Sequence, residues 1–182
     1  MLPRLLPMLA VPATPFDSPD YDFEVKWDGI RALAAVETMG WRLWGRGRAD
    51  YTARYPELDV LRRLPAGTLV DGELVAFDAE GQPDLPWLLR RHGLTDPWRI
   101  RQARHWCSVR YVLFDLLYHA GRCLLREPLP LVLQRRQDVA QQLKLANPRH
   151  WLLNPTAIAG AEPGRRHGLA DPWRIRKAQA GR

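Results

Sequence analysis

A lysine close to an acid, a glycine and an arginine is the first candidate for chemistry in this chain. Lys26, Asp28, Gly29 and Arg31 lie within six residues, and only three of the 27 basic residues are lysines. Arginine keeps its proton and cannot attack an electrophile, whereas a lysine can once burial or a neighbouring cation lowers its pKa. Lys26 is therefore a candidate nucleophile with a candidate phosphate-binding cation, Arg31, close by. The alternative is a strand that ends in a turn at Asp28 and Gly29, with Lys26 facing solvent.

Two carboxylates interrupt an apolar run further along the chain. Asp71 and Glu73 are two residues apart within residues 68–77, so they share one face of a strand. Burying both charges costs free energy unless a cation, a hydroxyl-bearing ligand or a metal faces them. The alternative is an exposed face paired with basic side chains. Phe114, in a second apolar run, is by itself more typical of a core residue than of a stacking platform.

The elements that must position these residues are mostly strands. The predicted strands have alternating or continuous apolar residues and cover 23–26, 31–36, 41–44, 68–77 and 111–118. Two predicted helices begin at prolines and cover 56–64 and 130–145. Strands and helices do not alternate in the βαβ order that is typical of a parallel sheet. We therefore expect an α+β fold with antiparallel sheets.

The composition of the chain indicates which class of partner and which cellular compartment to expect. A net charge of +7 and a pI near 10.0 favour a polyanionic partner, nucleic acid first. No apolar run approaches the ~20 residues that span a bilayer, and the proline-rich first residues do not match a signal peptide. Cys107 and Cys123 lack the spacing of a metal site, so we expect a cytoplasmic protein with free thiols.

Four motifs, in order, resemble those of the covalent nucleotidyltransferases. Residues 26–31 match the signature K-x-D-G-x-R, and Arg46 resembles the arginine of the second motif. Residues 71–73 resemble the D-G-E motif, and Phe114 resembles the aromatic motif that follows it. Several motifs in order are far more specific than one.

The flanking phrases are similar to those of one branch of that superfamily. Residues 55–58 resemble the phrase that usually follows the second motif. Residues 7–10 and 15–17 resemble the lead-in of bacterial ATP-dependent DNA ligases of the end-joining type, and the likeness covers roughly residues 6–155. The resemblance implies an incomplete nucleotidyltransferase (ATP-grasp-like) fold without the C-terminal OB-fold domain. It implies three segments: an extended lead-in over 1–20, a partial adenylation domain over 21–155, and an atypical tail over 156–182.

The resemblance also implies a role for each motif residue. Lys26 would attack the α-phosphate of ATP and form lysyl-AMP. Five further side chains would bind the nucleotide: Glu24, Arg31, Arg46, Glu73 and Phe114. Of these, Glu73 would accept hydrogen bonds from the ribose hydroxyls and Phe114 would stack on adenine. Glu24 would border the adenine edge, and both arginines would contact phosphates.

The implied cofactors and partners follow from the same family. They are ATP and Mg²⁺, nicked or broken duplex DNA as the substrate of repair, and a Ku-type end-joining protein as a candidate partner. No membrane association is implied, and no residue is assigned as a metal ligand.

The later part of the chain departs from the family pattern. No E-G-x-V phrase follows Phe114, and the nearest match to the W-x-K-x-K motif, at 173–177, is one residue out of register. Residues 90–101 recur at 165–176 with a single difference, Thr95 against Ala170. The repeat is either a second basic and aromatic patch for nucleic acid or the product of recombination. We favour recombination, because repeat architectures need three or more units.

Two hypotheses of different classes therefore stand. The chain is an adenylation domain whose activity is impaired by loss of the later motifs, or it is a noncatalytic ATP- or DNA-binding remnant of a ligase. An RNA ligase or capping-type enzyme would share the chemistry of Lys26 but fits the lead-in and residues 55–58 less well.

Overall fold

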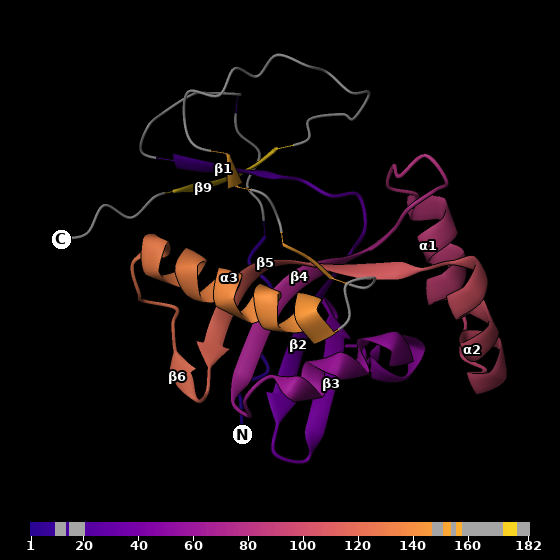
Figure 1. The fold of residues 1–182 in the computed structure, drawn as a ribbon, viewed down its shortest axis with the longest axis horizontal. Helices are drawn as coiled ribbons and strands as arrows, with labels where there is room; N and C mark the ends of the chain where they lie inside the picture. Colours follow the sequence, from indigo (N-terminus) through magenta and orange to yellow (C-terminus); the bar gives the residue numbers. More distant parts are fainter. Residues whose placement is uncertain (10–13, 15–20, 147–150, 154–155, 158–172, 178–182) are drawn as a thin grey trace.

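A mostly antiparallel sheet of six strands forms the body of the molecule (Figure 1). The computed structural model describes residues 1–9, 14, 21–146, 151–153, 156–157 and 173–177. The sheet runs in the order β3-β2-β4-β5-β6, and β7 pairs with β5 in parallel. Its strands are β2 (Ile30–Glu37), β3 (Gly40–Gly45), β4 (Thr68–Ala76), β5 (Val109–His119), β6 (Arg122–Cys123) and β7 (Trp151–Leu153). The predicted α+β arrangement with antiparallel pairing is confirmed, apart from the one parallel pair.

A second, three-stranded sheet carries the strand that precedes Lys26. Strand β1 (Tyr21–Val25) lies between β8 (Thr156–Ala157) and β9 (Trp173–Lys177), and both pairings are antiparallel. The pairing sets Val25 opposite Trp173 and Tyr21 opposite Lys177. The segment nearest to the W-x-K-x-K motif is therefore hydrogen-bonded to the strand that leads into Lys26.

Helix α3 crosses the six-stranded sheet, and α1 and α2 lie together at one side of it (Figure 1). The described helices are the 3₁₀ helices η1 (Thr52–Arg54) and η2 (Pro56–Arg63) and the α-helices α1 (Leu85–His92), α2 (Pro97–Trp106) and α3 (Leu129–Ala146). The predicted helix at 56–64 exists but has 3₁₀ geometry. Helices α1 and α2 were not predicted, although Asp84 and Asp96 cap them through bonds to the backbone N–H of Trp87 and Arg99, each 2.8 Å.

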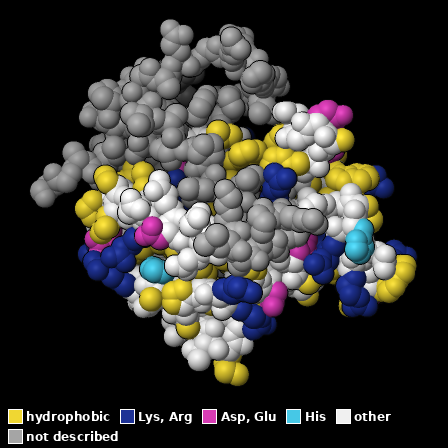
Figure 2. All heavy atoms as spheres, in the orientation of Figure 1, with side chains coloured by type: hydrophobic (Ala, Val, Ile, Leu, Met, Phe, Trp, Pro, Cys, Tyr) yellow, Lys and Arg dark blue, Asp and Glu magenta, His cyan; other side chains and the backbone are white. Residues whose placement is uncertain are grey.

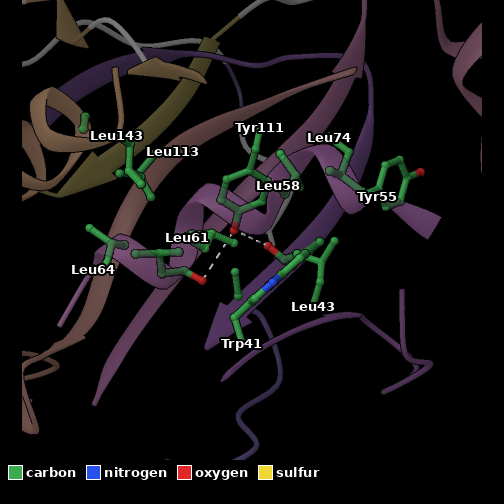
Figure 3. Packing of buried hydrophobic residues seen from close by; sticks show 14 of the residues in the cluster. Trp41, Leu43, Tyr55, Leu58, Leu61, Leu64, Leu74, Tyr111, Leu113 and Leu143 are labelled. Atoms are coloured by element: carbon green, nitrogen blue, oxygen red, sulfur yellow. Dashed lines mark hydrogen bonds between the residues drawn. The ribbon is translucent and has the colours of Figure 1, made fainter. Parts of the chain in front are cut away.

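The main core lies between the sheet and helices η2 and α3. Figure 3 shows Leu58 and Leu61 of η2 beside Tyr111, whose hydroxyl donates to the carbonyl oxygen of Ala32 at 2.8 Å. Leu64, directly after η2, belongs to the same cluster. Val132, Val139 and Leu143 of the predicted apolar stripe on α3 belong to the same buried cluster.

A smaller apolar cluster lies on the other face of the sheet. Alternation along β2 sends Leu33 and Ala35 to this face, where they pack with Trp44 and Leu69. The first residues of the lead-in cover it: Leu2 and Leu5 pack on the cluster. Trp44 Nε1 also donates to the carbonyl oxygen of Leu5 at 3.1 Å. Residues 10–13 and 15–20 of the predicted lead-in lie outside the described residues.

The two copies of the internal repeat differ in structure where both are described. Residues 98–101 belong to helix α2, whereas residues 173–176, with the same sequence, belong to strand β9. Asp96 caps the first copy, and β1 supplies backbone partners to the second. Local sequence therefore does not decide the conformation of this segment.

Candidate functional site

Lys26 lies directly after β1 and is exposed, at the start of a short loop that leads into β2. Gly29 in this loop packs tightly against β4. A Cβ atom at position 29 would lie 2.2 Å from the carbonyl oxygen of Leu74 and 3.0 Å from Cγ of Glu73. No other residue fits there without a shift of the backbone. The glycine of the first motif therefore joins the lysine loop to the strand of the D-G-E motif.

Arg31 and the two acidic residues of β4 form the centre of the site. Arg31 lies opposite Glu73 in the β2–β4 register. Its guanidinium binds Asp71 through two contacts, Nε to Oδ1 at 3.0 Å and Nη2 to Oδ2 at 2.5 Å. Nη1 donates to the carbonyl oxygen of Met8 at 2.8 Å. The cation required by the buried carboxylates is thus supplied by the first motif itself.

Burial and pairing act in opposite directions on Arg31. Its side chain is 16% exposed, and burial by itself would lower the pKa of the guanidinium. The hydrogen bonds and the charge of Asp71 outweigh that effect, with a further contribution from Glu73, so the pKa of Arg31 is raised. Arg31 is a permanent cation at this position.

Asp71 and Glu73 are both buried, which rules out the alternative of an exposed strand face. The glycine between them is required by its surroundings. A Cβ at Gly72 would lie 2.5 Å from the carbonyl oxygen of Val112 and 2.7 Å from the ring of Tyr111. The D-G-E sequence therefore reflects close packing of β4 on β5 as well as its acidic side chains.

Phe114 lies on β5 and is 1% exposed. The guanidinium carbon of Arg31 is 4.7 Å from the centre of its ring, a cation–π contact. The sequence alone favoured a core position for this ring, and the structure confirms that it is buried. Phe114 is nevertheless in direct contact with another residue of the predicted site.

Glu24, on β1, is also fully buried, and its partner is a residue that sequence reasoning missed. Nη1 of Arg136, on α3, donates to Oε1 of Glu24 and, at 2.7 Å, to the carbonyl oxygen of Phe114. The available signal was the position of Arg136 on the apolar stripe of its helix, four residues after Val132 and three before Val139. A charge on a buried stripe needs a partner.

Arg46 lies in the turn after β3, and its side chain is exposed. It shares a pocket of about 500 Å³ with Arg31, and the lining is Gly29, Ile30, Arg31, Arg46, Gly47, Tyr51, Leu85 and Leu89. Two arginines on one pocket suit a ligand with phosphate groups. Lys26 lies outside this pocket as the described residues form it.

Residues 55–58 anchor helix α1 beside this pocket. Glu57 accepts from Nη2 of Arg91 at 3.1 and 3.2 Å, and both side chains are at most 1% exposed. The Tyr55 hydroxyl bonds to Nδ1 of His92 at 2.8 Å. Burial raises the pKa of Tyr55, and burial with the charge of Arg54 lowers the pKa of His92. The neutral pair therefore persists near pH 7.

The structure therefore brings Arg31, Glu73 and Phe114 together and links Glu24 to Phe114 through Arg136. Lys26 and Arg46 are the exposed members of the predicted set. Among the described residues, no three His, Cys, Asp or Glu side chains gather as a metal site. Mg²⁺ is commonly held by one or two carboxylates together with substrate phosphates and water. That mode fits an ion that arrives with ATP.

None of the described helices is long and apolar enough to cross a membrane.

Comparison with known proteins gives a consistent result. The family model described as "ATP dependent DNA ligase domain" matches residues 7–154. The DNA ligase-like protein LigB from the SPbeta prophage of Bacillus subtilis is 28% identical over 142 residues, which is 78% of this chain and 48% of LigB. The multifunctional non-homologous end joining protein LigD of Mycobacterium bovis is 36% identical over 126 residues, 67% of this chain and 15% of LigD.

Solved structures agree with these sequence matches. The ligase domain of Mycobacterium tuberculosis LigD has a TM-score of 0.60 and 30% identity, over 85% of this chain and 48% of that domain. Mycobacterial DNA ligase D in complex with ATP has a TM-score of 0.59 and 28% identity, over 86% of this chain and 48% of the other. The chain thus spans about half the length of LigB and of these ligase domains.

Proposed function

Because this chain belongs to the family of ATP-dependent DNA ligase domains, we propose that it is an adenylation domain that forms lysyl-AMP at Lys26 and serves the sealing of DNA nicks or ends in repair. The observation that carries the proposal is the cluster of Arg31, Asp71, Glu73 and Phe114, buried together and joined to the lysine loop by Gly29. The predicted motif residues from β2, β4 and β5 thus meet at one place.

In the proposed first step, Nζ of Lys26 attacks the α-phosphorus of ATP. A P–N bond forms, the P–O bond to pyrophosphate breaks, and the amine gives up its proton. Arg31 and Arg46 supply positive charge on the phosphate side, and Glu73 accepts from the ribose hydroxyls. Bound Mg²⁺ would neutralise phosphate charge. The neighbouring mycobacterial ligase structure is a complex with ATP, which supports this choice of nucleotide.

In the later steps the adenylyl group passes to a 5′-phosphate of DNA, and a 3′-hydroxyl then displaces AMP. Transfers of this kind depend on the positions of the reacting groups and on stabilisation of developing charge. Nicked or broken duplex DNA is the proposed substrate. A Ku-type end-joining protein is the proposed partner, since LigD is an end joining protein.

One observation favours the second candidate, a noncatalytic ATP- or DNA-binding remnant. Arg31 already binds Asp71 and the carbonyl oxygen of Met8, and Phe114 is 1% exposed beneath it. A nucleotide that stacks on Phe114 requires Arg31 or a neighbouring segment to move. A chain that cannot make this movement would bind phosphate or DNA without reacting.

Labelling with ATP that carries ³²P in the α-phosphate tests the proposal. Incubation with Mg²⁺, followed by denaturation, should leave label on the wild-type protein and none on Lys26→Ala. Lys26→Arg should also fail, because it keeps the charge and loses the nucleophile. Lys144→Arg is the matched control and should label like the wild type. A wild-type chain that takes no more label than Lys26→Ala would support the noncatalytic candidate instead.

A further inference from the structure

Arg136 is an unusual residue for its position on helix α3. Its side chain is 2% exposed, and it lies on the same helical stripe as the buried Val132, Val139 and Leu143. A buried guanidinium costs free energy that a well-packed apolar side chain would avoid, and replacement of buried ion pairs by apolar groups is often neutral or stabilising. Stability alone therefore gives a weak reason for an arginine here.

The contacts of Arg136 point to the nucleotide site. Its Nη1 atom donates both to Oε1 of Glu24 and to the carbonyl oxygen of Phe114. These acceptors belong to β1 and β5, strands of two different sheets. Glu24 is two residues before Lys26, and Phe114 contacts Arg31 through its ring. One guanidinium nitrogen thus fixes two residues of the proposed base site relative to each other.

We propose, as a deepening of the proposed function, that Arg136 is a positioning residue that sets the preference for ATP over GTP by holding the carboxylate of Glu24 at the base edge. A carboxylate accepts hydrogen bonds and donates none. Adenine presents an amino donor at position 6 of its ring, whereas guanine presents a carbonyl acceptor there. A fixed Glu24 carboxylate therefore favours adenine and repels guanine.

The geometry also explains why the discrimination depends on Arg136 and not on Glu24 alone. A glutamate side chain has three rotatable bonds, and its ordering costs entropy that weakens any contact it makes. The contact of Arg136 with Oε1 orders the side chain before the nucleotide binds. The hydrogen bond from Arg136 to the carbonyl oxygen of Phe114 also holds the ordered Glu24 side chain in a fixed position relative to β5, the strand that carries the aromatic ring.

The test is the affinity for ATP and for GTP, each measured without Mg²⁺ by competition with a fluorescent ATP analogue. The wild-type chain should prefer ATP. Arg136→Met should lower the ratio of ATP affinity to GTP affinity by about tenfold, the contribution of one charge-assisted hydrogen bond. GTP affinity should stay the same or rise, because the repulsion from a fixed carboxylate is relieved. Arg136→Lys should retain part of the preference. Arg135→Met, at a partly exposed position on the same helix, is the matched control and should keep the wild-type ratio.

A second set of variants covers the case in which Arg136→Met does not fold. Glu24→Gln should lower the ratio, and addition of Arg136→Lys to it should cause little further loss, because both act through one contact. Equal losses of affinity for both nucleotides, or additive effects in the double variant, would overturn the role of Arg136.

These outcomes are separable from those of the proposed function. A wild-type chain that prefers ATP but takes no covalent label would contradict adenylylation and leave the role of Arg136 standing. A wild-type chain that labels but binds both nucleotides equally would contradict the role of Arg136 alone. A chain that binds neither nucleotide would contradict both.

Discussion

Gly29 and Gly72 show how much of the signature of this site is packing. Each lies where a Cβ atom would come within 2.5 Å of a backbone carbonyl oxygen on a neighbouring strand. The two glycines let β2 and β5 approach β4 closely, and this approach brings Arg31 over Phe114. The glycines of the K-x-D-G-x-R signature and of the D-G-E motif therefore allow the close packing that positions the charged residues beside them.

Substitution of Gly29 tests this role. Gly29→Ala should lower the free energy of unfolding by about 1–3 kcal/mol, as overpacking in a rigid interior does, and should reduce labelling of Lys26. Urea denaturation measures the first effect. Gly93→Ala is the matched control, because its added Cβ would meet Leu89 O at 3.6 Å and the backbone angle φ is −70°. If both variants were equally stable, close approach would not be the reason for Gly29.

The site residues that the sequence predicts differ from Arg136 in how far along the chain their signal extends. Lys26, Arg31 and Glu73 were predicted because the motif spacing marks them within short segments. Arg136 was not, since its partner Glu24 is 112 residues away in the chain. Only its place on an apolar stripe marked it, and the identity of its partners required the folded arrangement.

At the scale of elements, strands were predicted well and short helices poorly. Alternating or continuous apolar residues located β1 to β5, because burial on sheet faces imposes these patterns. Helices α1 and α2 have 8 and 10 residues, and each buries only two of them, so their apolar faces are narrow. Their Asp caps, each close before a proline, were the local signal. The repeat shows that local sequence cannot predict secondary structure here, because the same four residues are helical at 98–101 and extended at 173–176.

The buried pair of Glu57 and Arg91 joins η2 to α1 and is the clearest element-scale contact to test. Removal of one partner leaves a buried charge. Arg91→Met or Glu57→Gln should therefore each destabilise the protein by about 3–5 kcal/mol. The double variant with Arg91→Met and Glu57→Gln should lose less than the sum of the single losses. Chemical denaturation measures all of them.

An exposed pair provides the control for this cycle. Arg62 and Asp59 are 54% and 60% exposed and form a contact three residues apart on η2. Arg62→Met should change stability by about 0.5 kcal/mol or less. If Arg91→Met had an equally small effect, the buried pair would not hold α1 in place.

At the scale of the whole molecule, basic side chains lie on several parts of the described surface. Figure 2 shows one such group, with a histidine, at the right-hand side of the view, where α1 and α2 lie. The exposed residues of α2 include Trp98, Arg99, Arg101, Arg104 and Trp106. Leu89 of α1, the helix that precedes α2, lines the pocket that also contains Arg31 and Arg46. We therefore predict a path for DNA that runs from this pocket onto α2.

Salt dependence of DNA binding tests that path. Affinity for nicked duplex DNA should fall as salt rises, because phosphate contacts release counterions. The double variant Arg99→Ala and Arg101→Ala should weaken binding and reduce the slope of log K against log salt by about 2. Fluorescence anisotropy over a salt series measures both quantities. Arg126→Ala, before α3, should leave the slope unchanged, and an equal effect of this control would show that the charge acts without a defined path.

The pairing of β1 has a consequence for synthesis of the protein. The ribosome releases β1 early, but its partners are residues 156–157 and 173–177. The six-stranded sheet, whose main strands lie between residues 30 and 119, can pair before those partners exist. Pairing between distant segments is slow, because long loops must close first. The strand that leads into Lys26 therefore gains its neighbours only after residues 156–157 and 173–177 have been synthesised, later than the main strands of the six-stranded sheet can pair.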